Sequence, residues 1–96
     1  MYIASEQMVR KKFQFYGRVQ GVGFRWRTRH AADAFHLTGW VRNEYDGSVQ
    51  MEVQGEEAMI DRLVQSLNED RYIDIRDMDV RVLPVDEDER RFEIRE

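Results

Sequence analysis

Apolar and polar residues alternate from Lys12 to Val19, which is typical of a strand with one buried face. From Phe24 the spacing becomes helical instead. The residues on this inward stripe are Phe24, Thr28, Ala31 and Phe35. The chain is therefore expected to begin with a strand, a short glycine-containing loop and an amphipathic helix.

The rest of the chain repeats these two periods. A second strand beginning at Gly39 and a returning strand are joined by Asp46-Gly47, a dipeptide that favours a hairpin turn. A second helix is predicted after Gly55, a fourth strand over residues 73–83, and a short strand near the end of the chain. The last strand carries Phe92 and Ile94. The side chains expected to point inward are those of Val41, Asn43, Tyr45, Val49, Met51, Val53, Met59 or Ile60, Leu63, Val64 and Leu67.

The predicted order is β-α-β-β-α-β plus one edge strand, which indicates an α+β fold of the ferredoxin-like type. Two helices then cover one face of a mostly antiparallel sheet. A single domain is expected over residues 11–96. Residues 1–10 precede the first predicted strand and are interpreted as an N-terminal extension that can be disordered. This fold hosts many unrelated functions, so the function has to be argued from a site.

Composition restricts the class of protein. Of the 96 residues, 42% are hydrophobic and 35% charged, and no apolar run approaches the roughly 20 residues of a membrane span. Cysteine is absent, which excludes disulfides, thiolate metal ligands and a cysteine nucleophile. A cytoplasmic location fits this composition, and no membrane partner is expected. We also expect a monomer, although no feature of the sequence fixes the oligomeric state.

The net charge of −4 conceals an asymmetry, because residues 1–43 carry +6 and the remainder carries −10. Such a division suggests a local site for an anion on an acidic protein, although charges also segregate by chance along solvated faces. A nucleic-acid-binding protein would more often be basic overall, so no nucleic-acid partner is expected.

The segment Gly17-Arg18-Val19-Gln20-Gly21-Val22-Gly23-Phe24-Arg25 lies between the first strand and the first helix. Its glycines permit backbone conformations closed to other residues, and the helix that follows offers unpaired amides and a positive dipole end. Arg25 adds a two-pronged donor for phosphate oxygens. A tight turn alone would also explain the glycines. Neither a dinucleotide fingerprint nor a P-loop fits, because Trp26, Val22 and Gly23 occupy positions where those motifs need other residues.

This nine-residue string closely resembles the first signature of the acylphosphatase family. The second signature is present as Gly39-Trp40-Val41-Arg42-Asn43, followed by Asp46-Gly47. The resemblance runs from about Phe13 to Leu67 and continues more weakly to the end of the chain. It implies a metal-independent enzyme without cofactors that hydrolyses small-molecule acyl phosphates.

By this resemblance, Arg25 binds the substrate phosphate and Asn43 positions the attacking water. The backbone amides of Val19, Gln20, Gly21, Val22, Gly23 and Phe24 would complete the phosphate site. An asparagine on a strand can also cap a turn, but the inward parity of Asn43 leaves a buried amide that needs a partner. Asp74, Asp77 and Asp79 lack the spacing of a metal-binding loop, so no metal site is predicted.

The chain departs from the family pattern at two places. His36 stands where the family usually has a glycine that ends the first helix, which predicts a left-handed conformation for a histidine. Glu69-Asp70-Arg71-Tyr72 replaces a turn that commonly contains Gly-Pro. Two other functions stay open: an acylphosphatase-like domain handling carbamoyl phosphate, as in hydrogenase-maturation proteins, and a non-catalytic module that binds anions or nucleic acid.

Overall fold

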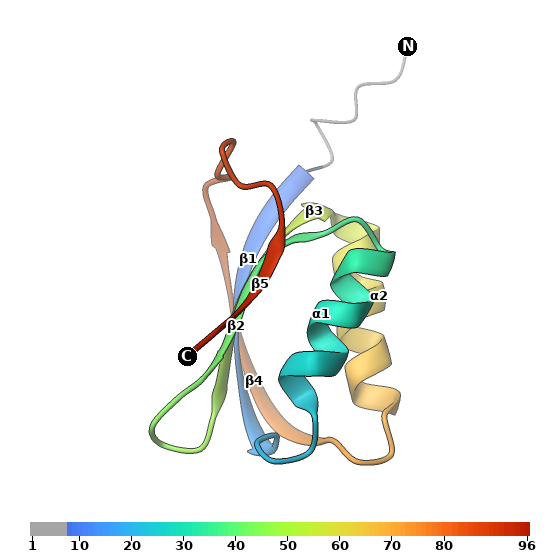
Figure 1. The fold of residues 1–96 in the computed structure, drawn as a ribbon, viewed down its shortest axis with the longest axis vertical. Helices are drawn as coiled ribbons and strands as arrows, with labels where there is room; N and C mark the ends of the chain where they lie inside the picture. The colour runs from blue at the N-terminus through green and yellow to red at the C-terminus, as the bar shows by residue number, and fades with distance from the viewer. Residues whose placement is uncertain (1–7) are drawn as a thin grey trace.

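The computed structural model describes residues 8–96 and contains two helices and five strands in this range. The elements are β1 (Met8–Arg18), α1 (Phe24–Ala34), β2 (Thr38–Asn43), β3 (Val49–Glu56), α2 (Glu57–Glu69), β4 (Asp74–Leu83) and β5 (Phe92–Arg95). The strands form one sheet in the order β4-β1-β3-β2-β5, in which only the β2–β5 pair is parallel. Both helices lie on one face of this sheet (Figure 1). The predicted ferredoxin-like α+β arrangement, including the short fifth edge strand, is confirmed.

The core lies between the two helices and the central strands. Alternate residues of β1, β3 and β2 point into it, among them Phe15, Met51 and Val41, all of which are fully buried. The predicted stripe of α2 is confirmed by the burial of Ile60, Leu63 and Leu67. In α1 the third buried residue is Ala32 and not the predicted Ala31, which is half-buried.

The first strand begins earlier than its alternating pattern predicted. Residues 8–10 of the expected extension 1–10 belong to β1 and pair with residues 54–56 of β3, whereas residues 1–7 lie outside the described range. The reason is the buried side chain of Arg10, which donates to Glu52 at 3.0 Å, Gln54 at 3.0 Å and Glu89 at 2.9 Å. A polar side chain can thus occupy a buried strand position because all its partners are present.

The first helix ends in the left-handed turn that the sequence predicted at His36, where φ is 59°. The His36 N–H donates to the Asp33 carbonyl at 3.3 Å, and the Leu37 N–H donates to the Ala32 carbonyl at 2.8 Å. These are the two hydrogen bonds of a Schellman motif. Leu37 is buried beyond the turn, so the chain returns to the sheet at the start of β2.

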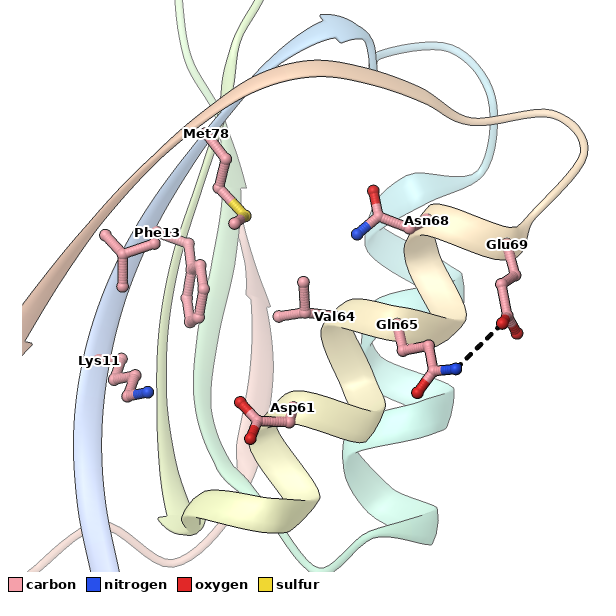
Figure 2. A pocket seen from close by; sticks show the side chains of 9 residues that line it. Lys11, Phe13, Asp61, Val64, Gln65, Asn68, Glu69 and Met78 are labelled. Atoms are coloured by element: carbon pink, nitrogen blue, oxygen red, sulfur yellow. Dashed lines mark hydrogen bonds between the residues drawn. The ribbon is translucent and has the colours of Figure 1, made fainter.

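The edge strand β4 is the least covered part of the sheet, because its helix-facing residues Met78, Val80 and Val82 are between 36% and 74% exposed. Together with Phe13 and residues of α2, Met78 and Val80 border an apolar hollow of about 500 Å³ between β4 and α2 (Figure 2). Its lysine, Lys11, is paired with Glu57 at 2.9 Å. The described residues that border this hollow include no unpaired cation and no helix N-terminus, so they do not suit a phosphate.

Candidate active site

The loop between β1 and α1 adopts the conformation that its glycines make possible. Gly21 and Gly23 have φ angles of 75° and 79°, in the left-handed region that favours glycine. Gly23 is also the N-cap of α1 and offers no side-chain cap. Within residues 8–96, the amide N–H groups from Gly21 to Trp26 have no hydrogen-bond partner. Unpaired amides at the positive end of a helix make a cradle for an anion.

Side chains on both sides of the glycines fix this loop in place. Val19 is fully buried and Phe24 is 2% exposed, so the loop is anchored in the core at both ends. The Gln20 side-chain amide donates to the carbonyls of Glu44 at 2.8 Å and Ser48 at 2.9 Å. These bonds join the loop to the β2–β3 turn, and Figure 1 shows the two segments at the same end of the molecule.

The loop, the first turn of α1 and the end of β2 meet at a pocket of about 280 Å³. Its lining includes Gly21, Gly23, Arg25, Trp26, Asn43, Ile94 and Glu96. The structure therefore brings Arg25 and Asn43, the two predicted catalytic residues, to one cavity with both glycines of the left-handed loop. The other residues of the predicted backbone site, Val19, Gln20, Val22 and Phe24, do not border it.

Arg25 is the cation that this pocket contains. Of the eight cationic side chains of residues 1–43, five form ion pairs with partners among the described residues, namely Arg10, Lys11, Arg27, Arg29 and Arg42. Arg25 has no hydrogen bond or ion pair in the part of the chain that the structure describes. Its guanidinium is therefore free to bind an anionic ligand in the pocket.

Asn43 is the last residue of β2, and its side chain carries an unusual feature. The Oδ1 atom is buried and has no hydrogen-bond partner within residues 8–96. A buried acceptor without a partner costs about 1–3 kcal/mol, so such atoms are uncommon unless a ligand or water completes them. The expected inward parity holds for Val41 and Asn43 but fails at Tyr45, which is fully exposed because the strand has given way to the turn.

Residues 11–94 match the family model of acylphosphatases. The chain belongs to the acylphosphatase family. A curated acylphosphatase of Oceanobacillus iheyensis is 40% identical over 86 residues, which cover 88% of this chain and 94% of the relative. The solved structure of an acylphosphatase from Coxiella burnetii matches with a TM-score of 0.86 and 30% identity, covering 99% of this chain and 100% of the other.

The same fold occurs within a longer protein. Full-length HypF, in its phosphate- and nucleotide-bound form, matches with a TM-score of 0.84 and 29% identity. The match covers 94% of this chain but 12% of HypF. An acylphosphatase-like unit is thus found both as a chain of this size and as one part of a larger protein.

The start of α1 is held by a contact with the segment that departs from the family pattern. The Asp70 carboxylate pairs with the Arg27 guanidinium at 3.0 Å and accepts from the Tyr72 N–H at 2.8 Å. The Arg27 guanidinium also lies 5.5 Å from the centre of the Tyr72 ring. Arg27 is one turn from Gly23, whose carbonyl accepts its N–H at 3.0 Å. The segment that replaces Gly-Pro is thus tied to the helix that carries the anion cradle.

Sequence reasoning missed three residues of the pocket: Trp26, Ile94 and Glu96. Trp26 follows Arg25 directly, so its place at the pocket could have been inferred from the predicted helix start. Ile94 comes near because β5 pairs in parallel with β2, with Ile94 opposite Val41. No local signal in the sequence specifies that pairing.

Residues 8–96 contain neither a metal-binding cluster nor a membrane-spanning helix. No cluster of three or more histidine, cysteine, aspartate or glutamate side chains there is arranged to hold a metal ion. No helix in the same range is long and apolar enough to cross a membrane.

Proposed function

We propose that the chain hydrolyses acyl phosphates to a carboxylate and orthophosphate at the pocket formed by the 19–25 loop and the end of β2. One observation carries this proposal: a single cavity is bordered by an unpaired arginine, a helix N-terminus without a side-chain cap and a buried amide oxygen without a partner. Membership of the acylphosphatase family supports the same reaction.

In the proposed complex, the phosphate lies on the amides at Gly21, Gly23 and the first turn of α1, and Arg25 binds two of its oxygens. These donors are present before the substrate arrives, because the loop is anchored by buried side chains. Preorganised donors stabilise charge on the phosphoryl oxygens in the transition state without a reorganisation cost.

Asn43 then positions the attacking water. Its Oδ1 accepts a hydrogen bond from the water, which aims a lone pair of the water oxygen at phosphorus on the side opposite the leaving carboxylate. The new bond joins the water oxygen to phosphorus as the bond from phosphorus to the acyl oxygen breaks. A proton of the water passes to a phosphate oxygen, so the products are a carboxylate and dihydrogen phosphate.

The proposed reaction does not require a general acid from the protein. The leaving group is a carboxylate whose conjugate acid has a pKa of roughly 4, so it departs without a general acid. Positioning and charge stabilisation supply the rate enhancement, and we propose that no metal is required. We further propose that the enzyme acts as a monomer in the cytoplasm, which gel filtration and fractionation would test.

The experiment is hydrolysis of benzoyl phosphate in the presence of a chelator. We expect turnover by the wild type, a higher KM together with a lower kcat for Arg25→Ala, and a fall in kcat of about 100-fold or more for Asn43→Ala. Arg62→Ala and Asn68→Ala are matched controls, because both residues are exposed on α2 and do not border the pocket. A folded wild type that leaves benzoyl phosphate intact would refute the proposal.

The same assay separates the alternatives. Carbamoyl phosphate used far better than benzoyl or acetyl phosphate would favour the carbamoyl-handling function of an acylphosphatase-like domain. Binding to oligonucleotide that weakens steeply with salt, without any hydrolysis, would instead favour a binding module.

A further inference from the structure

Trp26 is an exposed aromatic residue beside the proposed phosphate site. It follows Arg25 in the first turn of α1, is 61% exposed and borders the same pocket as Arg25 and Asn43. A single exposed hydrophobic residue is ordinary on a protein surface. The position of this one is not, because a substrate held by its phosphate in the pocket must extend past the residues that line it.

The Trp26 ring is supported by a neighbouring side chain of the same helix. It stacks on His30, one helical turn further along, with 4.7 Å between the ring centres and 17° between the ring planes. Residues at this spacing lie on the same face of a helix, and stacked aromatic pairs stabilise each other beyond their buried area. The indole is therefore a supported flat surface that needs little ordering when a ligand packs against it.

A second hollow continues from the pocket along α1. It has a volume of about 230 Å³ and is bordered by Trp26, Arg29, His30, Asp33 and Ile94. The two hollows share Trp26 and Ile94, so an apolar boundary connects the phosphate site to the second hollow. At its far end, Arg29 and Asp33 approach each other at 3.9 Å.

We propose that Trp26 and Ile94 form the subsite for the acyl group and favour substrates with a flat, apolar acyl group over those with a small one. This inference rests on the proposed hydrolysis of acyl phosphates. With the phosphate on the loop, an aromatic acyl group reaches the indole and packs against it and against the Ile94 side chain. An acetyl group has no ring to stack and gains much less from this surface.

The test compares kcat/KM for benzoyl phosphate and acetyl phosphate in the wild type and in Trp26→Ala. We expect the benzoyl-to-acetyl ratio to fall by roughly 3- to 10-fold in Trp26→Ala, the range that aromatic stacking supports, and to be largely retained in Trp26→Phe. Tyr45→Ala is the matched control, because Tyr45 is an exposed aromatic residue in the β2–β3 turn that does not border either hollow.

Binding provides a readout that does not depend on turnover. Phenylphosphonate should bind more tightly than methylphosphonate in calorimetry, and Trp26→Ala should abolish that preference. A benzoyl-to-acetyl ratio or a phosphonate preference that is unchanged in Trp26→Ala, or equally reduced in Tyr45→Ala, would overturn the subsite. If the wild type hydrolyses neither acyl phosphate, the proposed function fails, whereas the phosphonate comparison still decides the subsite.

Discussion

Replacing His36 by glycine should stabilise the protein. His36 occupies the left-handed position of the Schellman motif, with φ of 59°, and its side chain is exposed. A residue with a Cβ pays about 1–2 kcal/mol in this region, whereas glycine does not. Glycine loses about 0.5–1 kcal/mol more conformational entropy on folding. Taken from the middle of both ranges, the difference leaves a net stabilisation of about 0.5–1 kcal/mol for His36→Gly.

The expected gain is large enough to measure by two methods. For a domain of this length, about 1 kcal/mol corresponds to a rise in Tm of roughly 4–8 °C. Urea unfolding followed by circular dichroism should show a higher midpoint with an unchanged slope, because the surface exposed on unfolding stays the same.

His36→Ala separates the backbone effect from loss of the imidazole. Alanine keeps the Cβ, so this variant should show no gain. Within residues 8–96, the His36 side chain has no hydrogen bond or ion pair whose loss would confuse the comparison. A His36→Gly variant no more stable than His36→Ala would refute the argument from backbone strain.

Three further predictions concern contacts that hold the fold and the site. Asp70→Asn removes the ion pair with Arg27 at the start of α1. It should therefore lower the free energy of unfolding by up to about 1 kcal/mol and reduce kcat/KM for benzoyl phosphate. Urea denaturation and kinetics on the same preparation would measure the two effects. Arg10→Met should cost on the order of 3 kcal/mol in urea unfolding, since two partly buried carboxylates lose their cation. Hydrogen bonds from the hydroxyl and the N–H of Ser48 hold the pKa of Asp46 below its usual value. These hydrogen bonds contribute stability above the ordinary aspartate pKa near 4, and the contribution is lost as the pH falls through the lowered pKa of Asp46. In that acid range the urea midpoint of Asp46→Asn should therefore change less with pH than the midpoint of the wild type.

The sequence was sufficient for those features of the fold that depend on neighbouring residues. The alternation along β1, the helical spacing of α2 and the Asp46-Gly47 turn each depend on a few consecutive positions, and each was correctly predicted. The left-handed conformation of His36 was predicted from the resemblance to the family, which usually has a glycine at this position, and it is confirmed by the φ of 59°.

Two incorrect predictions concern strand ends, which depend on contacts that a local sequence pattern does not show. The start of β1 at Met8 depends on partners of Arg10 that lie 42 to 79 residues away, so the alternation that begins at Lys12 did not reveal it and residues 1–10 were assigned to an extension. Inward parity was extended to Tyr45, but parity applies only while the strand continues. The turn hydrogen bond from the Gly47 N–H to the Glu44 carbonyl ends that strand at Asn43.

The arrangement around the glycine loop explains why a few sequence motifs were enough to locate the proposed site. Within residues 8–96, two buried side-chain atoms lack a hydrogen-bond partner, Asn43 Oδ1 and Arg27 Nε. Asn43 shares the pocket with Gly23, and Arg27 Nε lies 3.5 Å from where a Cβ on Gly23 would stand. Both atoms therefore flank the glycine loop, whereas the other buried side-chain polar atoms of residues 8–96 have hydrogen-bond partners. Buried polar atoms without partners are expected to gather at a functional site, because there a ligand or water supplies the hydrogen bonds that the fold does not.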